Sequence, residues 1–504
     1  MPIQLLLFLF PVLGAVLAAI PGVPSKALRQ VSAIVGVATF LIVGWLSYTG
    51  GFFQEGEVAS FFAGKVLRLD ALACFLLLLV SVLYASVMLV SVRYMGEEQV
   101  EGIVDARKNR LYYGMGHLFV LSMLLAAVAN HVGVLWFALE ATTLSTTLLV
   151  AFYRKEGGVE AAWKYVLLCS TGIALGLIGV LMVGFAATQA GLSPQEAFNL
   201  AALRASAGSL SPDLMRWAFV FLFIGIGTKV GFVPMHTWLP DAHSKTPSPI
   251  SAFLSGTLLN CAFVTILRFK DLVDFSLNQT WWTERFFLVF GLLSVALPAF
   301  IFLGLRNYKR LLAYSSVEHM GLMAICVGLG PIGVVPMLMH MAGHTLAKSG
   351  LFFGAGEWLL RYKTTKIDLL PRLMRTDTRT AGLFLALMLA LLAVPLSPLF
   401  ASEYFLVAIG INLNKPITFI FMLLLVLAFV GMMRATFAML FDPTMLGTES
   451  HEPSREAAHP EGWRITHGVM AVHVVLLVAL GYWFFTAEGF QVLSRVAKLI
   501  TSTV

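Results

Sequence analysis

The feature that most constrains this chain is the recurrence of apolar segments long enough to cross a bilayer as helices. Hydrophobic residues make up 59% of the 504 residues and charged residues 12%, which leaves too little polar surface for a water-soluble protein of this size. The sequence therefore predicts an all-α polytopic membrane protein with about fourteen transmembrane helices. The predicted spans are residues 3–20, 31–49, 69–91, 111–129, 132–152, 161–187, 215–240, 249–268, 284–304, 310–329, 333–356, 380–410, 416–440 and 464–485.

The distribution of Lys and Arg among the connections indicates how the chain is inserted. Most of these residues fall in connections that share one side of the membrane if both termini lie on the other side. Short cytoplasmic loops carry the excess of basic residues, so both termini are expected to face outward. The first span is expected to stay in the bilayer as a helix, because no basic residue precedes it as in a signal peptide. The net charge of +7 then reflects topology, and no nucleic-acid partner is expected.

Two blocks of five predicted spans follow three N-terminal helices. Residues 1–110 hold helices 1–3, residues 111–268 the first block, residues 284–440 the second, and residues 441–504 a cytoplasmic loop, helix 14 and the C-terminal tail. Because five is odd, the two blocks cross the membrane in opposite orientations, as in transporters built from inverted repeats. Prolines lie within helices 7 and 12, so both helices are expected to be broken.

No cofactor or metal site is expected. The four cysteines, Cys74, Cys169, Cys261 and Cys326, lie singly in different apolar spans, without the paired spacing of zinc, haem or iron–sulfur ligands. The glycines around residue 227 lie inside a predicted helix and do not form a phosphate-binding loop. An ATP-driven pump is therefore disfavoured, and the chain itself is not expected to carry electrons.

The apolar segment 215–240 contains Lys229, and Pro234 follows five residues later. A charge within the membrane costs about 2.5–3.5 kcal/mol on insertion scales, so it calls for a partner and a role. Glu140, inside the fifth predicted span, is the natural partner. Intramembrane ionisable residues usually take part in transport, although such a pair can also be an inert bridge between helices. Transport of an ion or of protons is the favoured interpretation.

His340, His344 and Lys348 recur at steps of four in the span 333–356. On a helix this spacing forms one stripe, with a rise of about 6 Å per step. Histidine exchanges protons near neutral pH, so the stripe is suited to pass protons along the helix. His340 alone is equally well explained as a satisfied core residue, whereas His344 and Lys348 are the favoured relay.

Two carboxylates are further candidates in apolar spans. Glu403 follows two prolines in the predicted span 380–410 and suits the end of a proton path. Glu318 stands beside His319 and can hold a proton. Adjacent helical residues point in different directions, so Glu318 and His319 need not act together.

Three more candidates lie near the predicted inner boundary of the membrane. Lys164 is either a relay residue or a lysine that extends its amine to the membrane surface. Asp241 and His243 either cap the next helix or take part in transport.

Four motifs occur in family-like order and spacing: LEATTL around Glu140, GTKVGFVPMHTWLPDAHSKTPSPISAFLSG around Lys229, YKRLLAYSSVEHMGLM around Glu318, and HMAGHTLAKSGLFF around Lys348. Over residues 110–440 the chain resembles the antiporter-like, proton-translocating membrane subunits of respiratory complex I, which are related to multi-subunit cation/proton antiporters. The wording VEHMG and ATTLSTTLLVAFY, with no long lateral helix expected after the last span, is most similar to the F-type membrane subunit of hydrogenase-4 and formate hydrogenlyase-like complexes.

The resemblance implies a non-redox subunit of an oxidoreductase complex in a bacterial or archaeal plasma (inner) membrane, with other membrane subunits as partners. It implies that Glu140 and Lys229 are a coupled ion pair, that His344 and Lys348 form the central relay, and that Glu403 ends the path.

One position departs from the family pattern. Some members carry a lysine or histidine in span 8 where this chain has Asn260. The link from Lys229 to the span 333–356 then needs water, Asn260 or His236.

Three functions are open at this point. The favoured one is translocation of protons along buried Glu, Lys and His residues, driven by a redox reaction in a partner subunit. The second is exchange of Na⁺ or K⁺ for protons. The third is a non-transporting scaffold or quinone-contacting subunit, in which Lys229 and Glu403 can be neutralised without effect.

Overall fold

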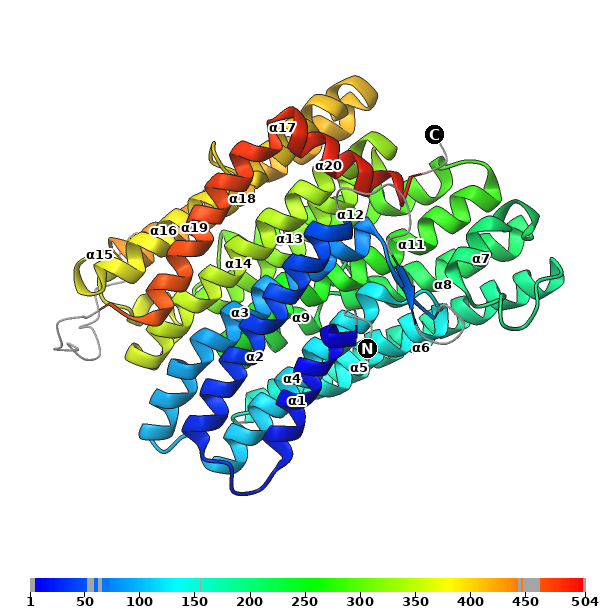
Figure 1. Cartoon of the computed structure of the whole chain (residues 1–504). Coiled ribbons are helices and arrows are strands. Elements are labelled where there is room, and N and C mark those ends of the chain that lie inside the picture. The colour runs from blue at the N-terminus through cyan, green and yellow to red at the C-terminus, as the bar shows by residue number, and fades with distance from the viewer. Residues whose placement is uncertain are drawn as a thin grey trace.

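A computed structural model describes residues 5–51, 59–61, 66–154, 156–442, 446 and 463–501. Most of these residues are helical, and Figure 1 shows the long helices running roughly side by side through one bundle. A pair of short antiparallel strands, β1 (Ala59–Phe61) and β2 (Leu67–Leu69), departs from the all-α prediction.

The helices follow one another along the chain in three groups. The first are α1 (Leu6–Ala19), α2 (Ser25–Leu46), the π-helical turn η2 (Ser47–Gly51) and α3 (Ala71–Val100). Next come α4 (Ala106–Val128), α5 (Val132–Val150), α6 (Glu156–Gln189), α7 (Leu200–Ala205), η4 (Ala207–Ser209), α8 (Pro212–Val230), α9 (Trp238–Lys245), α10 (Ser248–Phe253), the π-helical turn η5 (Leu254–Leu258) and α11 (Leu259–Leu277). The last are α12 (Trp281–Phe302), α13 (Tyr308–Gly328), η6 (Pro331–Gly333), α14 (Val334–Tyr362), η7 (Ile367–Leu369), α15 (Leu373–Thr376), α16 (Thr378–Leu391), α17 (Pro398–Leu413), α18 (Lys415–Leu440), α19 (Ile465–Phe484) and α20 (Ala487–Lys498).

Among the described residues, 10 helical segments are long and apolar enough to cross a membrane, and α1, α16 and α17 are shorter apolar helices. Neither α8 nor α14 is one of the 10, because Lys229 and other charged residues interrupt α8, and His340, His344 and Lys348 interrupt α14. Composition alone therefore does not identify α8 and α14, which carry the predicted buried lysines, as membrane spans. The chain is a multi-pass membrane protein, and the number fourteen stays a prediction.

Both predicted helix interruptions are present. The predicted span 215–240 is divided between α8 and α9, and the predicted span 380–410 between α16 and α17. At the first break Gly231 has a φ of +84°, which glycine adopts without the strain of a larger side chain. Each break leaves backbone groups without intrahelical partners inside the bundle, where side chains can bind them.

Some spans lie inside the bundle and can carry polar groups away from lipid. The segment formed by α10, η5 and α11 is buried throughout its most apolar part, and α13 almost throughout, whereas α18 and α19 are buried along only about a third of theirs. The π-helical turn η5 lies within this innermost segment. Such turns inside longer helices are rare and are frequently found at functional sites.

After the last predicted span, the short amphipathic helix α20 follows α19 and packs against α14 and α3 (Figure 1). Its apolar side chains Val492, Leu493 and Val496 are buried, whereas Arg495 and Lys498 are more accessible. Leu499, just beyond it, shares a small cavity with Arg268. This helix therefore ties the C-terminal segment to both the first and the second half of the bundle.

The contact between α6 and α8 is the most extensive one between helices in the described structure. Gly172 and Gly176 on α6 lie against Gly225 on α8, so that the two backbones nearly touch. A Cβ atom on Gly225 would lie 2.5 Å from the carbonyl oxygen of Gly172 and 2.5 Å from the amide nitrogen of Gly176. Small residues of this kind allow membrane helices to approach closely. The approach fixes α8 one turn before Lys229.

We expect Gly225→Ala to destabilise the protein, because its methyl group would meet backbone atoms that cannot turn aside. Overpacking of this kind costs about 1–3 kcal/mol. Thermal unfolding of the purified protein in detergent measures the effect. Gly44→Ala on α2 is the matched control, because nothing in the described structure lies within 4 Å of the Cβ it would add. An unchanged unfolding midpoint for Gly225→Ala would contradict the close approach of α6 and α8.

Candidate functional site

Lys229 lies in the last turn of α8, at the break before α9, and its side chain is fully buried. The C-terminal end of a helix carries partial negative charge, which favours a cation in this turn. Trp238, the first residue of α9, donates its indole N–H to the carbonyl oxygen of Thr228 at 2.8 Å. The break in the helix thus presents the lysine amine to the interior of the bundle.

Lys229 and Glu140 face each other through a hydroxyl group. The lysine Nζ donates to Thr143 Oγ1 at 2.5 Å, and this hydroxyl donates to Glu140 Oε2 at 3.4 Å, so the charges are at most about 6 Å apart. Tyr165 accepts a second bond from the lysine at 3.1 Å, and Ser170 donates to Glu140 Oε1 at 2.7 Å. The predicted partners are therefore close together, but Thr143 separates them.

Lys348 is fully buried in the middle of α14 and contacts α13. Its amine donates to the carbonyl oxygen of Leu312 and, at 2.5 Å, to Ser315 Oγ. Its Nζ also lies 5.9 Å from the centre of the Phe352 ring. All three of these neighbours are uncharged. The centre of the bundle thus holds a lysine whose amine is bound by neutral groups.

Three histidines from α13 and α14 form a row beside the central lysine. The ring centres of His344 and His319 are 5.3 Å apart, and His319 Nδ1 lies 2.8 Å from His340 Nε2. His340 Nδ1 in turn lies 2.8 Å from Ser402 Oγ on α17. The row connects α14 to α17, and hydrogen bonds between imidazole and hydroxyl groups are suited to proton transfer.

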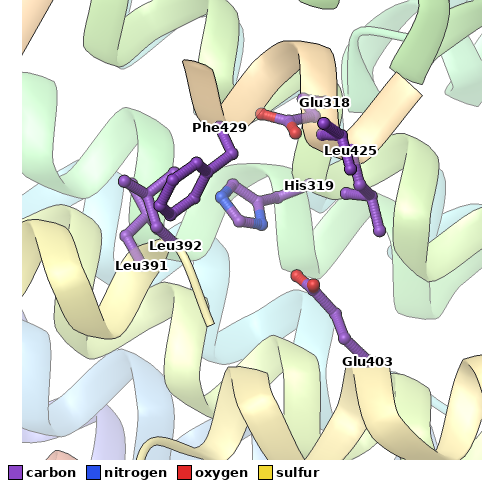
Figure 2. A pocket seen from close by; sticks show the side chains of 8 residues that line it. Glu318, His319, Leu391, Leu392, Glu403, Leu425 and Phe429 are labelled. Carbon is purple, nitrogen blue, oxygen red and sulfur yellow. The ribbon is translucent and has the colours of Figure 1, made fainter. Parts of the chain in front are cut away.

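Glu403, in the second turn of α17, and Glu318, on α13, line one cavity of about 230 Å³ together with His319. Figure 2 shows the two carboxylates and the imidazole directed into the same space. The remaining lining residues are apolar: Leu391, Leu392, Leu425, Val426 and Phe429. Two carboxylates and an imidazole in one cavity can accept a proton from the histidine row and release it from its far end.

The interval between Lys229 and Lys348 contains polar atoms but no complete chain of hydrogen bonds between described side chains. Asn260 Nδ2 donates to Thr345 Oγ1 and to the Gly256 carbonyl oxygen, both at 2.8 Å, and so joins the π-helical turn η5 to α14. Asn260 Oδ1 is buried without a hydrogen-bond partner among the described residues. Such atoms are positions at which water can hydrogen-bond. Asn260 therefore links the innermost segment to α14 within this interval.

Lys164 lies outside the buried row. It forms ion pairs with Glu160 at 2.6 Å and with Asp241 at 3.2 Å, and its side chain is 46% exposed. Asp241 also lies 3.4 Å from Arg310. The surroundings of Lys164 are those of a lysine that extends to the surface, the alternative that its sequence position left open.

The candidate site contains groups that were not singled out from the sequence. Thr143 and Ser402 are hydroxyl residues in helices, where most such groups bond to the backbone one turn earlier. The contact of His319 with His340 joins two helices, and no spacing within either helix indicates it. The only sequence signal for these groups is a nearby glutamate: Thr143 lies one turn after Glu140, Ser402 precedes Glu403, and His319 follows Glu318.

Comparison with known proteins gives a consistent result. The profile of the family described as NADH:quinone oxidoreductase/Mrp antiporter, transmembrane, matches residues 129–431. A hydrogenase-4 component F homolog from Methylacidiphilum infernorum (isolate V4) is 34% identical over 402 residues, which cover 79% of this chain and 81% of that protein.

Two solved structures share the fold. A chain of the membrane-bound sulfane sulfur reductase, an archaeal respiratory membrane complex, has a TM-score of 0.82 at 20% identity and covers 98% of this chain and 97% of its own. A chain of respiratory complex I from Thermus thermophilus has a TM-score of 0.78 at 22% identity and covers 98% and 99%. At these identities the likeness shows the fold alone.

Proposed function

Because this chain belongs to the family of NADH:quinone oxidoreductase and Mrp antiporter transmembrane subunits, we propose that it translocates protons within a redox-driven membrane complex. The observation that supports this most strongly is the row of buried groups from Lys348 through His344, His319 and His340 to the cavity of Glu403. Buried ionisable residues in membrane helices are usually part of an ion pathway. A row of them that ends in a cavity offers a path for protons.

The proposed cycle begins at Glu140 and Lys229. A redox event in a partner subunit alters their separation and thereby the affinity of Lys229 for its proton. A proton then moves from Lys229 through water near Asn260 to Lys348. From Lys348 a proton passes along the histidines to Glu403. Changing the distance within a charge pair at an effective dielectric constant of about 20 alters its energy by a few kcal/mol. Moving one charge through 100 mV requires about 2.3 kcal/mol, so the energies are comparable.

We propose that both termini face outward and that the chain has fourteen spans, with residues 111–268 and 284–440 as inverted repeats. In support, α8 with α9 and α16 with α17 are interrupted at corresponding places of the two blocks, and a charged residue lies near each break. Inverted repeats place transport paths at their interface. The hydrogenase-4 relative and the respiratory complexes that share the fold favour other membrane subunits, in a prokaryotic plasma membrane, as partners.

Proton uptake by inverted membrane vesicles that contain the assembled complex tests this function against its two rivals. We expect electron transfer to drive uptake at the same rate with and without sodium, because the row consists of groups that exchange protons. Uptake that requires Na⁺ or K⁺ would favour a cation/proton antiporter, which the family also includes by its description. Electron transfer without uptake would favour a scaffold or quinone-contacting subunit.

A further inference from the structure

A second cluster of buried ionisable side chains lies at the inner end of the bundle, where α3 ends and α13 begins. Glu98, near the end of α3, is 5% exposed, and its Oε1 accepts a 2.6 Å hydrogen bond from the hydroxyl of Tyr153. Tyr94, one turn earlier, lies 3.2 Å from the same hydroxyl. Oε2 of Glu98 is buried and has no partner within the described part of the chain. Leaving such an oxygen unbonded is costly unless water or a proton satisfies it.

Lys309, the second residue of α13, is fully buried and donates to the carbonyl oxygen of Thr246 at 2.7 Å. It forms no ion pair of 4.0 Å or less with a described carboxylate, but Glu98 acts on it electrostatically. Lys245 also acts on Lys309. Glu98 and Lys309 are thus an acid and a base, both shielded from solvent, that lie near each other at one end of the bundle.

A purely structural carboxylate at the same end has different surroundings. Glu357 on α14 accepts from Arg93 at 3.2 Å, from Arg464 at 2.8 Å and from Thr466 at 2.5 Å, so both of its oxygens are bonded. Glu357 therefore connects α3, α14 and α19, as expected of a carboxylate whose role is to hold helices together. Glu98 has one bonded oxygen and one without a partner in the described chain, so a tie between helices does not explain its position.

The cluster is connected to the centre through α13. Lys309 and Ser315 are six residues apart on this helix, about 9 Å along its axis. The amine of Lys348 is bonded to Leu312 and Ser315. Lys348 therefore contacts α13 between about one and two helical turns beyond Lys309.

His243 lies in the interval between the two lysines. It comes from α9, is fully buried, and its ring centre is 6.2 Å from that of Phe352, one turn beyond Lys348 on α14. Both Lys348 and Lys309 act on it electrostatically. The backbone at Leu239 and Leu254 lies beside the ring, but neither ring nitrogen makes a hydrogen bond of good geometry to a described residue. A buried imidazole with two such nitrogens can accept a proton on one side and release one on the other.

We propose that Glu98 and Lys309 form the proton-loading site at the inner end, and that His243 carries protons from it to Lys348. The proposal rests on the proposed function. In the first step protonated Glu98 breaks its O–H bond by giving the proton to a bridging water, which gives a proton to the neutral amine of Lys309, because the two groups are too far apart for direct transfer. The ammonium of Lys309 then gives a proton through water to His243, and the imidazolium gives one to neutral Lys348. No electrons are transferred; the Glu98 carboxylate takes up a new proton from the inner aqueous phase, and Lys348 becomes neutral again when its proton passes to the histidine row.

Two further charged residues lie near the loading site. Lys363 and Glu101 form an ion pair with each other and both act on Glu98. Their side chains are 43% and 37% exposed, so charged groups in contact with water lie near Glu98.

Two substitutions separate proton transfer from structural support. Lys309→Arg keeps the positive charge and an N–H donor for Thr246, but a guanidinium group does not release its proton inside a protein. Glu98→Gln keeps the shape and an acceptor for Tyr153 but carries no exchangeable acid proton. We expect each to reduce proton uptake by inverted vesicles at least about tenfold, a barrier change of about 1.4 kcal/mol, with assembly unchanged.

The controls address charge and access. Lys366→Met removes an exposed charge from the same end, beside Asn307 and outside the proposed path, and should leave uptake at the wild-type rate. In inverted vesicles the inner end faces the medium, so formate or azide added there should restore part of the uptake of Glu98→Gln, because a small weak acid can replace the missing carboxyl group. A carboxylate that only tied helices together would show no such rescue.

The outcomes separate this inference from the proposed function. Wild-type uptake by Lys309→Arg and Glu98→Gln, with uptake lost in Lys229→Ala, would overturn the loading site and leave the function standing. Uptake that Lys309→Met loses and Lys309→Arg restores would assign the cluster a structural role, which also overturns the loading site. Wild-type uptake in all of these variants would overturn both.

Discussion

Replacing Lys229 by alanine should abolish redox-driven proton uptake, with a fall of at least about tenfold in vesicles that contain the assembled complex. The lysine is fully buried at the break of α8, and its amine is bonded to Thr143 and Tyr165. Without it, Glu140 loses the cation that faces it across Thr143. Lys229→Arg should fail as well, because arginine keeps the charge but does not release a proton. The measurement is uptake with electron transfer followed in parallel.

Arg216 on the same helix provides the control. Its side chain is 41% exposed and pairs with Asp213 at 2.7 Å, so Arg216→Ala removes a cation from α8 outside the buried row. It should pump at the wild-type rate, because exposed ion pairs contribute little. Wild-type uptake by Lys229→Ala in an assembled complex would remove Lys229 from the mechanism and favour the scaffold interpretation.

The second large effect is expected at the other end of the row. Glu403→Gln should also reduce uptake at least about tenfold, because an amide of the same size cannot bind and release a proton at neutral pH. Glu403 shares the cavity of about 230 Å³ with Glu318 and His319. Proton uptake in the same vesicles measures the effect. A retained Glu318 limits the loss only if either carboxylate alone can serve the cavity.

Glu488→Gln is the matched substitution for this experiment. Glu488 is an exposed carboxylate in the first turn of α20, outside the cavity. It should leave uptake unchanged. If Glu403→Gln pumps as well as Glu488→Gln, Glu403 is not required on its own. Loss of uptake in the double variant with Glu318→Gln would then show that either carboxylate serves the cavity, and retained uptake would remove the cavity from the path.

The sequence was sufficient to predict the interrupted helices and the family. Lys229 with Pro234 in an apolar run, and two prolines before Glu403, indicate broken spans, and α8 with α9 and α16 with α17 confirm them. These predictions succeed because proline acts on the local backbone. Membership of the antiporter-like family, expected from four motifs, is confirmed by the match over residues 129–431.

Contacts between helices were beyond the reach of the sequence. His319 and His340 meet because α13 and α14 turn these faces toward each other, and periodicity within one helix does not fix that rotation. Thr143 lies between Glu140 and Lys229 for the same reason. Lys164 near the start of a span fits either a relay or the surface, and only the position of Asp241 shows that its amine is in a surface ion pair.

The hydroxyl of Thr143 has a consequence for regulation. A pair already in contact can only be pulled apart, whereas Glu140 and Lys229, held at most about 6 Å apart, can either close or separate. At an effective dielectric constant of about 20, closing from about 6 to about 4 Å changes the energy by about 1.4 kcal/mol, roughly a tenfold change in a proton equilibrium. In the mechanism proposed above, a neighbouring subunit that displaced α5 by a fraction of a helical turn would therefore either strengthen or weaken proton binding at Lys229. Because the Thr143 hydroxyl holds the pair apart, a movement of α5 can change the proton affinity in either direction.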